Sequence, residues 1–259
     1  MALTKKQKEE IKNFLKEKLE EKLARYKRET TYMPFLVRLI QDTEKVAAYS
    51  FIQSVATTLG MSIYEEVSRI IAQASAEEYK TKCDLNSTLS RKQKEVIEEI
   101  IRQLRNGERK VNKKKEIEEV LRAPWKNGKP QKEGRIVDFY MKRNGIEYLF
   151  EIKTVKPNID VFTASKRKLL EWIARLRRKA ETILAFPYNP YHPQSYTRFT
   201  EQGLLEHGKE LLVGKEYWDF LGGENTYEEL LEIFDQVGKF YKEKILEKIK
   251  EVAKTKFKE

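Results

Sequence analysis

The stretch RIVDFYMKRNGIEYLFEIKTVK, residues 135–156, decides the fold of the chain. It contains two strand-like runs, which are joined by Asn144-Gly145. Asn-Gly between two apolar-rich runs predicts a two-residue β-hairpin turn, because both turn positions need a positive φ. When these two residues form the turn, the pairing register places Asp138 directly opposite Glu151.

The two faces of this hairpin differ in character. Alternate positions of a strand share a face, so Lys153 joins Asp138 and Glu151 on the first face. The second face is apolar and should be buried; it carries Val137, Phe139, Met141, Tyr148, Phe150 and Ile152. Two close carboxylates repel each other unless a positive charge lies between them, and a divalent cation with oxygen ligands meets that need. A neighbouring lysine can orient a water or stabilise negative charge, so this face predicts metal-assisted hydrolysis of a phosphodiester.

Asp138 followed by Glu151-Ile152-Lys153 resembles the PD-(D/E)xK nuclease motif, with Val137 where the motif name has proline. By its residues alone, the same pattern also fits an ordinary charged face of an exposed hairpin. A wider resemblance extends over residues 54–239 and is to the TdeIII-like type II restriction endonucleases. Its most specific segments are EIKTVKPN, FPYNPY and GKEYWDFLGG.

This resemblance implies an α/β fold of the restriction-endonuclease type, with a mixed central sheet flanked by helices and a helical N-terminal region. It implies a homodimer that cuts double-stranded DNA at a short palindromic site, of the GGNCC type, and a cognate DNA methyltransferase in the same system. Mg²⁺ would be held by Asp138, Glu151 and the backbone carbonyl of Ile152, and Lys153 would position the attacking water. A repair or junction-resolving nuclease and a non-catalytic DNA-binding protein are the alternatives.

An additional metal ligand is expected on a helix that precedes the hairpin. Residues 44–79 have a helical pattern, in which Ser62 and Glu65 show the spacing of a capping box and predict a helix N-terminus. The resemblance implies a second role for Glu65, because residues 54–72 are similar to a helix that supplies an acidic metal ligand. Glu66 is the competing position, and both roles of Glu65 stay open.

The composition limits the class of protein. The chain has 259 residues and a net charge of +11, from 52 Lys+Arg against 41 Asp+Glu. This charge suits a polyanionic partner such as DNA, although a lysine-rich surface of a thermophile would look similar. Cys83 is the only cysteine, which excludes a disulfide framework and favours the cytoplasm. Two histidines argue against a histidine-rich zinc site, and no apolar run reaches the length of a membrane span.

Basic and amide side chains beyond the motif are candidates for DNA contact. Lys156 and Asn158 follow the catalytic strand, where a phosphate or a base edge would arrive; a plain turn asparagine is the alternative. Residues 163–180 form a basic amphipathic helix, which with the strand after it predicts a βαβ-like crossover. Its Lys166 and Arg167 are expected to contact the DNA backbone unless they are only solvated.

The segment 186–200 is an irregular loop that is rich in proline and aromatic residues. Its Asn189, Gln194 and Arg198 are side-chain types that read base edges in the major groove. A packed aromatic loop without a recognition role fits the same residues.

We expect three segments along the chain. Residues 1–125 form a mainly helical N-terminal region that contributes a helix to the nuclease core, and residues 126–200 form the catalytic core and recognition loop. Residues 201–259 form a C-terminal helical region that joins the core in one compact domain. Residues 81–89 are rich in turn formers and are expected to be a loop.

Overall fold

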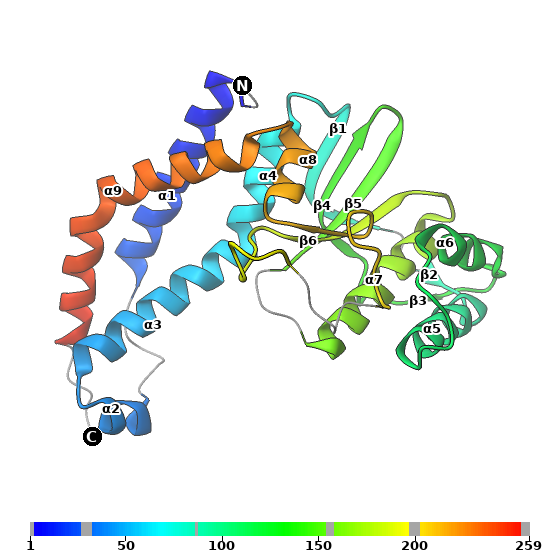
Figure 1. The fold of residues 1–259 in the computed structure, drawn as a ribbon, viewed down its shortest axis with the longest axis horizontal. Coiled ribbons are helices and arrows are strands. Elements are labelled where there is room, and N and C mark those ends of the chain that lie inside the picture. Colours follow the sequence, from blue (N-terminus) through cyan, green and yellow to red (C-terminus); the bar gives the residue numbers. More distant parts are fainter. Residues whose placement is uncertain (1–2, 27–32, 86–87, 154–157, 197–202, 255–259) are drawn as a thin grey trace. The chain divides into compact units, whose positions relative to one another are not determined.

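A computed structural model describes residues 3–26, 33–85, 88–153, 158–196 and 203–254 (Figure 1). The contacts between residues divide the chain into two compact units. One unit comprises Leu3–Ile70 and the chain from Glu228 onward, and the other comprises Ile71–Tyr227. The segment limits that the sequence suggests at residues 125 and 200 stay predictions.

The larger unit is built on a five-stranded sheet with the strand order β1-β4-β5-β6-β7. The strands are β1 (Glu78–Asp84), β4 (Ile136–Arg143), β5 (Ile146–Ile152), β6 (Glu181–Phe186) and β7 (Leu211–Val213). The first three strands are antiparallel neighbours, whereas β5, β6 and β7 run parallel to one another. The expected α/β class with a mixed central sheet is therefore confirmed.

The hairpin of β4 and β5 has the register that the sequence predicts. Asn144 and Gly145 form its turn, with φ angles of 52° and 73° in the left-handed region. Pairing continues along the strands as far as Phe139 and Phe150. Asp138 and Glu151 occupy the next position on each strand, directly beyond this last pair.

Helices cover both faces of this sheet. α7 (Ile159–Leu176) connects β5 to the parallel strand β6 and packs on one face, together with α5 (Arg91–Arg105) and α6 (Lys113–Arg122) (Figure 1). α8 (Lys215–Gly222) covers the other face, where the rings of Tyr217 and Phe220 lie 5.7 and 6.1 Å from that of Phe150. The expected crossover is present, and most of the apolar hairpin face is fully buried.

Two short strands and one unexpected strand complete the larger unit. β2 (Thr88–Leu89) pairs with β3 (Lys129–Pro130) in a separate two-stranded sheet. The loop expected at residues 81–89 is wrong for its first half, because β1 occupies that part of the chain. β1 lies at the edge of the sheet and is mostly exposed, and its alternation of charged residues with Tyr79, Thr81 and Cys83 is weaker than the apolar alternation that marks a buried strand.

The smaller unit is helical. It contains α1 (Lys5–Arg25), α2 (Pro34–Ile40), α3 (Thr43–Thr58), the π-helical turn η1 (Leu59–Ile63), and most of α4 (Tyr64–Ala72) and α9 (Thr226–Ala253). The helix start expected at Ser62 is wrong, because α3 continues through η1 into α4 without a break. Within the described residues, no helix combines the length and the apolarity needed to cross a bilayer.

Candidate active site

The two carboxylates lie on adjacent strands. Asp138 is near the beginning of β4, and Glu151 is near the end of β5. The Oδ2 atom of Asp138 accepts a hydrogen bond of 2.8 Å from the backbone N–H of Ile152. This bond holds the aspartate against the strand that carries the glutamate.

Glu151 is almost completely buried, and its two oxygens differ in their surroundings. The Oε1 atom lies 2.8 Å from the Nζ atom of Lys153. The Oε2 atom is buried and accepts no hydrogen bond from any described residue. A buried carboxylate oxygen without a partner is destabilising, and a cation at this position would remove that penalty. The residues present therefore fit a divalent cation.

The hard oxygen donors of this site suit Mg²⁺ better than a soft metal. They form a small set, because no group of three or more His, Cys, Asp and Glu side chains among the described residues is arranged to hold a metal. Asp138 and Glu151 are the hairpin carboxylates beside Lys153. The backbone carbonyl of Ile152 as a third ligand stays a prediction.

Lys153 keeps its proton in this arrangement. Partial burial lowers the pKa of its ammonium, but the charge and hydrogen bond of Glu151, together with the charge of Asp138, raise it more. The net pKa therefore lies above its ordinary value. Lys153 can act on a substrate through its positive charge and its N–H donors.

Glu65 lies on α4 in the smaller unit, and its side chain is buried. Its neighbour Glu66 accepts hydrogen bonds of 2.9 and 2.7 Å from the guanidinium of Arg69, so the competing residue already has a cationic partner. A metal-binding role for Glu65 stays a prediction that rests on the sequence resemblance.

Asn158 has a structural task at the start of α7. Its Oδ1 atom accepts hydrogen bonds from the backbone N–H groups of Asp160 and Val161, at 3.1 and 3.0 Å. The residue is thus the N-cap of the helix, which agrees with the plain structural reading of this asparagine. Lys156 lies outside the described residues.

Lys166 does not reach the surface. Its side chain is completely buried, and its Nζ atom lies 2.5 Å from Glu116 and 2.6 Å from Glu210. The expected contact of Lys166 with DNA is therefore wrong, because a buried ammonium between two carboxylates is not available to a phosphate. Arg167 is about one-third exposed and forms an ion pair with Glu98, with N–O distances of 2.5 and 2.9 Å.

The described part of the loop after β6, residues 187–196, is internally hydrogen-bonded, and only its two end residues, Pro187 and Tyr196, are buried. The side chain of Asn189 accepts a bond of 2.9 Å from the N–H of Tyr191 and donates one of 2.7 Å to the carbonyl of Gln194. The ring of the buried Tyr196 lies 5.5 Å from that of Phe186. Asn189 therefore organises the loop, whereas Gln194 is exposed. Arg198 lies outside the described residues.

The segment GKEYWDFLGG supports the site from the opposite face of the sheet. Gly214 has a φ of 56° and lies so close to the backbone N of Asn189 that an added Cβ would approach it to 3.3 Å. On α8, the indole N–H of Trp218 donates a hydrogen bond of 2.8 Å to the carbonyl of Pro187. This segment thus fixes the beginning of the loop after β6.

One residue close to the carboxylates did not stand out in the sequence. The Nζ atom of Lys168, on α7, lies 3.7 Å from the Oε1 atom of Glu151. Helical periodicity places Lys168 on the polar side of its helix but does not say which strand that side faces. No local pattern would have singled it out.

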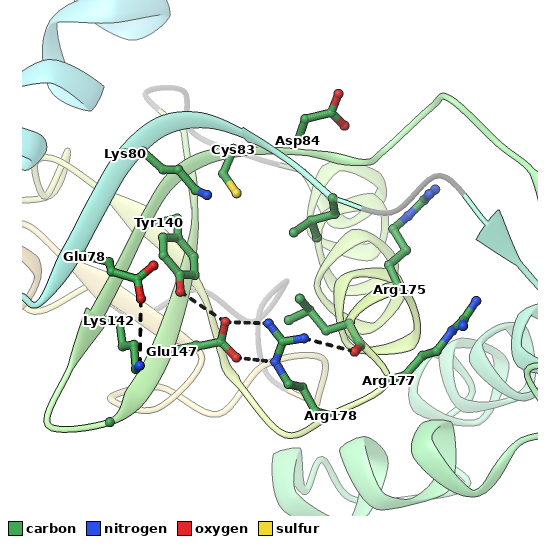
Figure 2. A pocket seen from close by; sticks show the side chains of 13 residues that line it. Glu78, Lys80, Cys83, Asp84, Tyr140, Lys142, Glu147, Arg175, Arg177 and Arg178 are labelled. Carbon is green, nitrogen blue, oxygen red and sulfur yellow. Dashed lines mark hydrogen bonds and ion pairs between the residues drawn. The ribbon is translucent and has the colours of Figure 1, made fainter.

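A larger hollow lies on the same sheet face, nearer the hairpin turn. Figure 2 shows this cavity of about 790 Å³, in which Tyr140, Glu147 and Arg178 point toward one another. Tyr140 donates a hydrogen bond of 3.1 Å to Glu147, which also accepts bonds of 2.6 and 2.7 Å from Arg178. Burial and the charge of Glu147 raise the pKa of Tyr140. The acidic side chains of this cavity form ion pairs with basic side chains, whereas the buried Oε2 atom of Glu151 has no hydrogen-bond partner among the described residues.

Comparison with known proteins matches this chain to one family of enzymes. Residues 3–238 match the model of the family described as type II restriction endonuclease, HinfI. The chain is 31% identical over 219 residues to the type II restriction enzyme MjaII of Methanocaldococcus jannaschii, a match that covers 76% of this chain. It is 30% identical over 202 residues to HgiCII and 28% identical over 198 residues to HgiEI, two type II restriction enzymes of Herpetosiphon aurantiacus.

The matches cover the relatives to different extents. This chain spans 58% of the length of MjaII, and 71% of the lengths of HgiCII and HgiEI. About 73% of this chain takes part in each of the two Herpetosiphon matches.

Proposed function

Because this chain belongs to the HinfI family of type II restriction endonucleases, we propose that it hydrolyses phosphodiester bonds of double-stranded DNA at a short palindromic site. One observation carries the proposal for this chain itself. Asp138 and Glu151 lie on adjacent strands of the hairpin, and Lys153 contacts one oxygen of Glu151 while the other has no hydrogen-bond partner among the described residues. The sequence resemblance favours a site of the GGNCC type.

The residues divide the chemistry among them. Bound Mg²⁺, held by Asp138, Glu151 and the carbonyl of Ile152, would supply a Lewis acid for the phosphoryl oxygen and charge stabilisation for the leaving oxygen. Lys153 would orient the attacking water by hydrogen bonding and would stabilise the charge that develops on the phosphoryl group. The bond from Ile152 N–H keeps Asp138 in place throughout.

The DNA partner and the assembly follow from the charge and the symmetry of the target. A net charge of +11 favours binding to a phosphate backbone. A two-fold homodimer matches a palindromic site, so each subunit would cut one strand. Lys156, Arg167, Gln194 and Arg198 remain the proposed DNA contacts, and Glu65 remains a proposed metal ligand. A cognate methyltransferase would protect the host DNA.

Cleavage of linear plasmid DNA of known sequence, in the presence of Mg²⁺, tests this function. The wild-type chain should give discrete fragments whose ends share one palindromic sequence. Lys153→Met should abolish the fragments, whereas Lys179→Met, which removes a lysine that is 72% exposed, should preserve the pattern.

Three other results would contradict the proposal. Cleavage of branched DNA in preference to plasmid would identify a structure-specific nuclease. Fragments that persist in Lys153→Met would place the reaction elsewhere. DNA binding without cleavage by the wild-type chain, in both Mg²⁺ and Mn²⁺, would identify a non-catalytic binding protein.

A further inference from the structure

The charge around Glu151 includes a second lysine besides the one in the motif. The Nζ atom of Lys168 is 3.7 Å from Glu151 Oε1, the same oxygen that Lys153 contacts at 2.8 Å. Lys153 comes from the end of β5, and Lys168 comes from α7, which packs over the sheet. Two ammonium groups from different elements therefore converge on one carboxylate.

The ammonium of Lys168 is held in place but retains its donors. Its Nζ atom lies 5.1 Å from the ring centroid of Trp172, whose indole N–H is anchored to the carbonyl of Gly134 at 2.8 Å. The side chain is only 22% exposed. Among the described residues, no acceptor lies within hydrogen-bond distance of this ammonium; at 3.7 Å, Glu151 is too far away. A partly buried ammonium with unused N–H donors is well suited to an incoming anion.

Charge balance indicates which anion fits. Asp138 and Glu151 carry two negative charges, and Lys153 and Lys168 carry two positive charges, so the four side chains are neutral together. A bound divalent cation would make the site doubly positive. A phosphodiester carries one negative charge and gains a second as the pentacovalent transition state forms, so the site with Lys168 would match the charge of that state.

We propose that Lys168 is a further catalytic residue, which donates a hydrogen bond to a non-bridging oxygen of the scissile phosphate. This inference rests on the proposed endonuclease function. The side chain would supply positive charge that a second metal ion supplies in two-metal nucleases, at a site where no group of three or more His, Cys, Asp and Glu side chains among the described residues is arranged to hold a metal.

A single-turnover cleavage assay on a short duplex that contains the mapped site gives the first test. Lys168→Met should lower the cleavage rate by about 100-fold, as expected for the loss of one donor to the transition state. Lys168→Arg should recover part of the rate, because it restores the charge and the N–H donors. Lys179→Met is the matched control and should cleave at the wild-type rate. Melting curves establish that each variant is folded.

A second test measures binding without divalent cations and so does not depend on catalysis. Two duplexes are compared, one with the natural phosphate and one with an uncharged methylphosphonate at the scissile position. Lys168→Met should weaken binding of the natural duplex but not of the methylphosphonate duplex, since the contact is already absent there. Lys179→Met should change the affinity for both duplexes by the same factor.

The outcomes separate this inference from the function on which it rests. Suppose that wild type cuts at discrete sites. If folded Lys168→Met then cleaves at the wild-type rate, or binds both duplexes more weakly by the same factor, the role of Lys168 is overturned. The proposed endonuclease function is unaffected by either result. If only the dependence of the rate on Mg²⁺ concentration changes, Lys168 merely positions Glu151 and the phosphate contact is refuted. If wild type cuts no DNA, the proposed function falls, and the inference falls with it.

Discussion

The carboxylate of Asp138 and the backbone N–H of Ile152 are joined by a hydrogen bond of 2.8 Å across the β4–β5 hairpin. The bond ties an acidic side chain of one strand to the residue that follows Glu151 on the other. We therefore propose two tasks for Asp138: one oxygen maintains the local pairing, and its negative charge contributes to the proposed cation site.

These two tasks can be separated by substitution. Asp138→Asn keeps an oxygen that accepts the bond from Ile152 but loses the charge, so cleavage should fall by about 1,000-fold or more while the melting temperature stays close to wild type. Asp138→Ala should lose the same activity and also about 1 kcal/mol of unfolding free energy, since the N–H of Ile152 loses its acceptor. Cleavage rates and urea unfolding measure the two effects. Equal stability of the two variants would show that the bond contributes nothing.

The buried Lys166 should matter for stability and not for DNA binding. Lys166→Met leaves the carboxylates of Glu116 and Glu210 buried without their cation, so the unfolding free energy should fall by about 3–5 kcal/mol. Arg167→Met, at the adjacent position, removes a partly exposed ion pair and should cost less than about 1 kcal/mol. Urea unfolding of both variants tests this. A similar loss of unfolding free energy in the two variants would mean that the buried triad of Lys166, Glu116 and Glu210 contributes no more to stability than the exposed ion pair.

The triad should also make stability depend on pH. Burial raises the pKa of Glu210, Lys166 lowers it, and Glu116 raises it again, with a net increase. A carboxyl group with a raised pKa in the folded state stabilises the fold at low pH, and that contribution is lost as the pH rises above about 4.3, its value in the unfolded chain. Glu210→Gln should therefore gain stability relative to wild type as the pH rises above that value, measured by urea unfolding. A difference that does not change with pH would contradict the raised pKa.

Two residues of the loop after β6 should respond differently to substitution. Asn189→Ala removes two hydrogen bonds that organise the loop, so it should lower the unfolding free energy by about 1 kcal/mol and slow cleavage of all sites alike. Gln194→Ala removes an exposed side chain, so the melting temperature should not change. If Gln194 reads a base, this variant should reduce discrimination at one position of the site by about 10- to 100-fold. Cleavage rates on duplexes that differ by one base pair decide this, and unaltered discrimination would remove Gln194 from the recognition surface.

Local features of the sequence were sufficient to predict the hairpin and its carboxylate pair. The Asn144-Gly145 turn sets the register through its own backbone geometry, and a strand exposes alternate residues to the same face. These rules involve only neighbours in the chain, and the structure confirms the register. They do not extend to β1, because this exposed edge strand alternates charged residues with Tyr79, Thr81 and Cys83 and has no strongly apolar face to reveal it.

The partners of the cationic residues around the site were determined by the tertiary structure alone. Lys166 and Lys168 are two positions apart on one helix, so their side chains point about 200° apart at 100° per residue. Both belong to a basic run for which the sequence suggested contact with DNA phosphates, and only Lys166 of the two was singled out as a site residue. Packing of α7 against α6 and the sheet buries Lys166 between Glu116 and Glu210, and brings Lys168 to Glu151. The partners of both lysines are distant in the sequence, so only the folded chain distinguishes an internal ion pair from a charge beside Glu151, the proposed catalytic carboxylate.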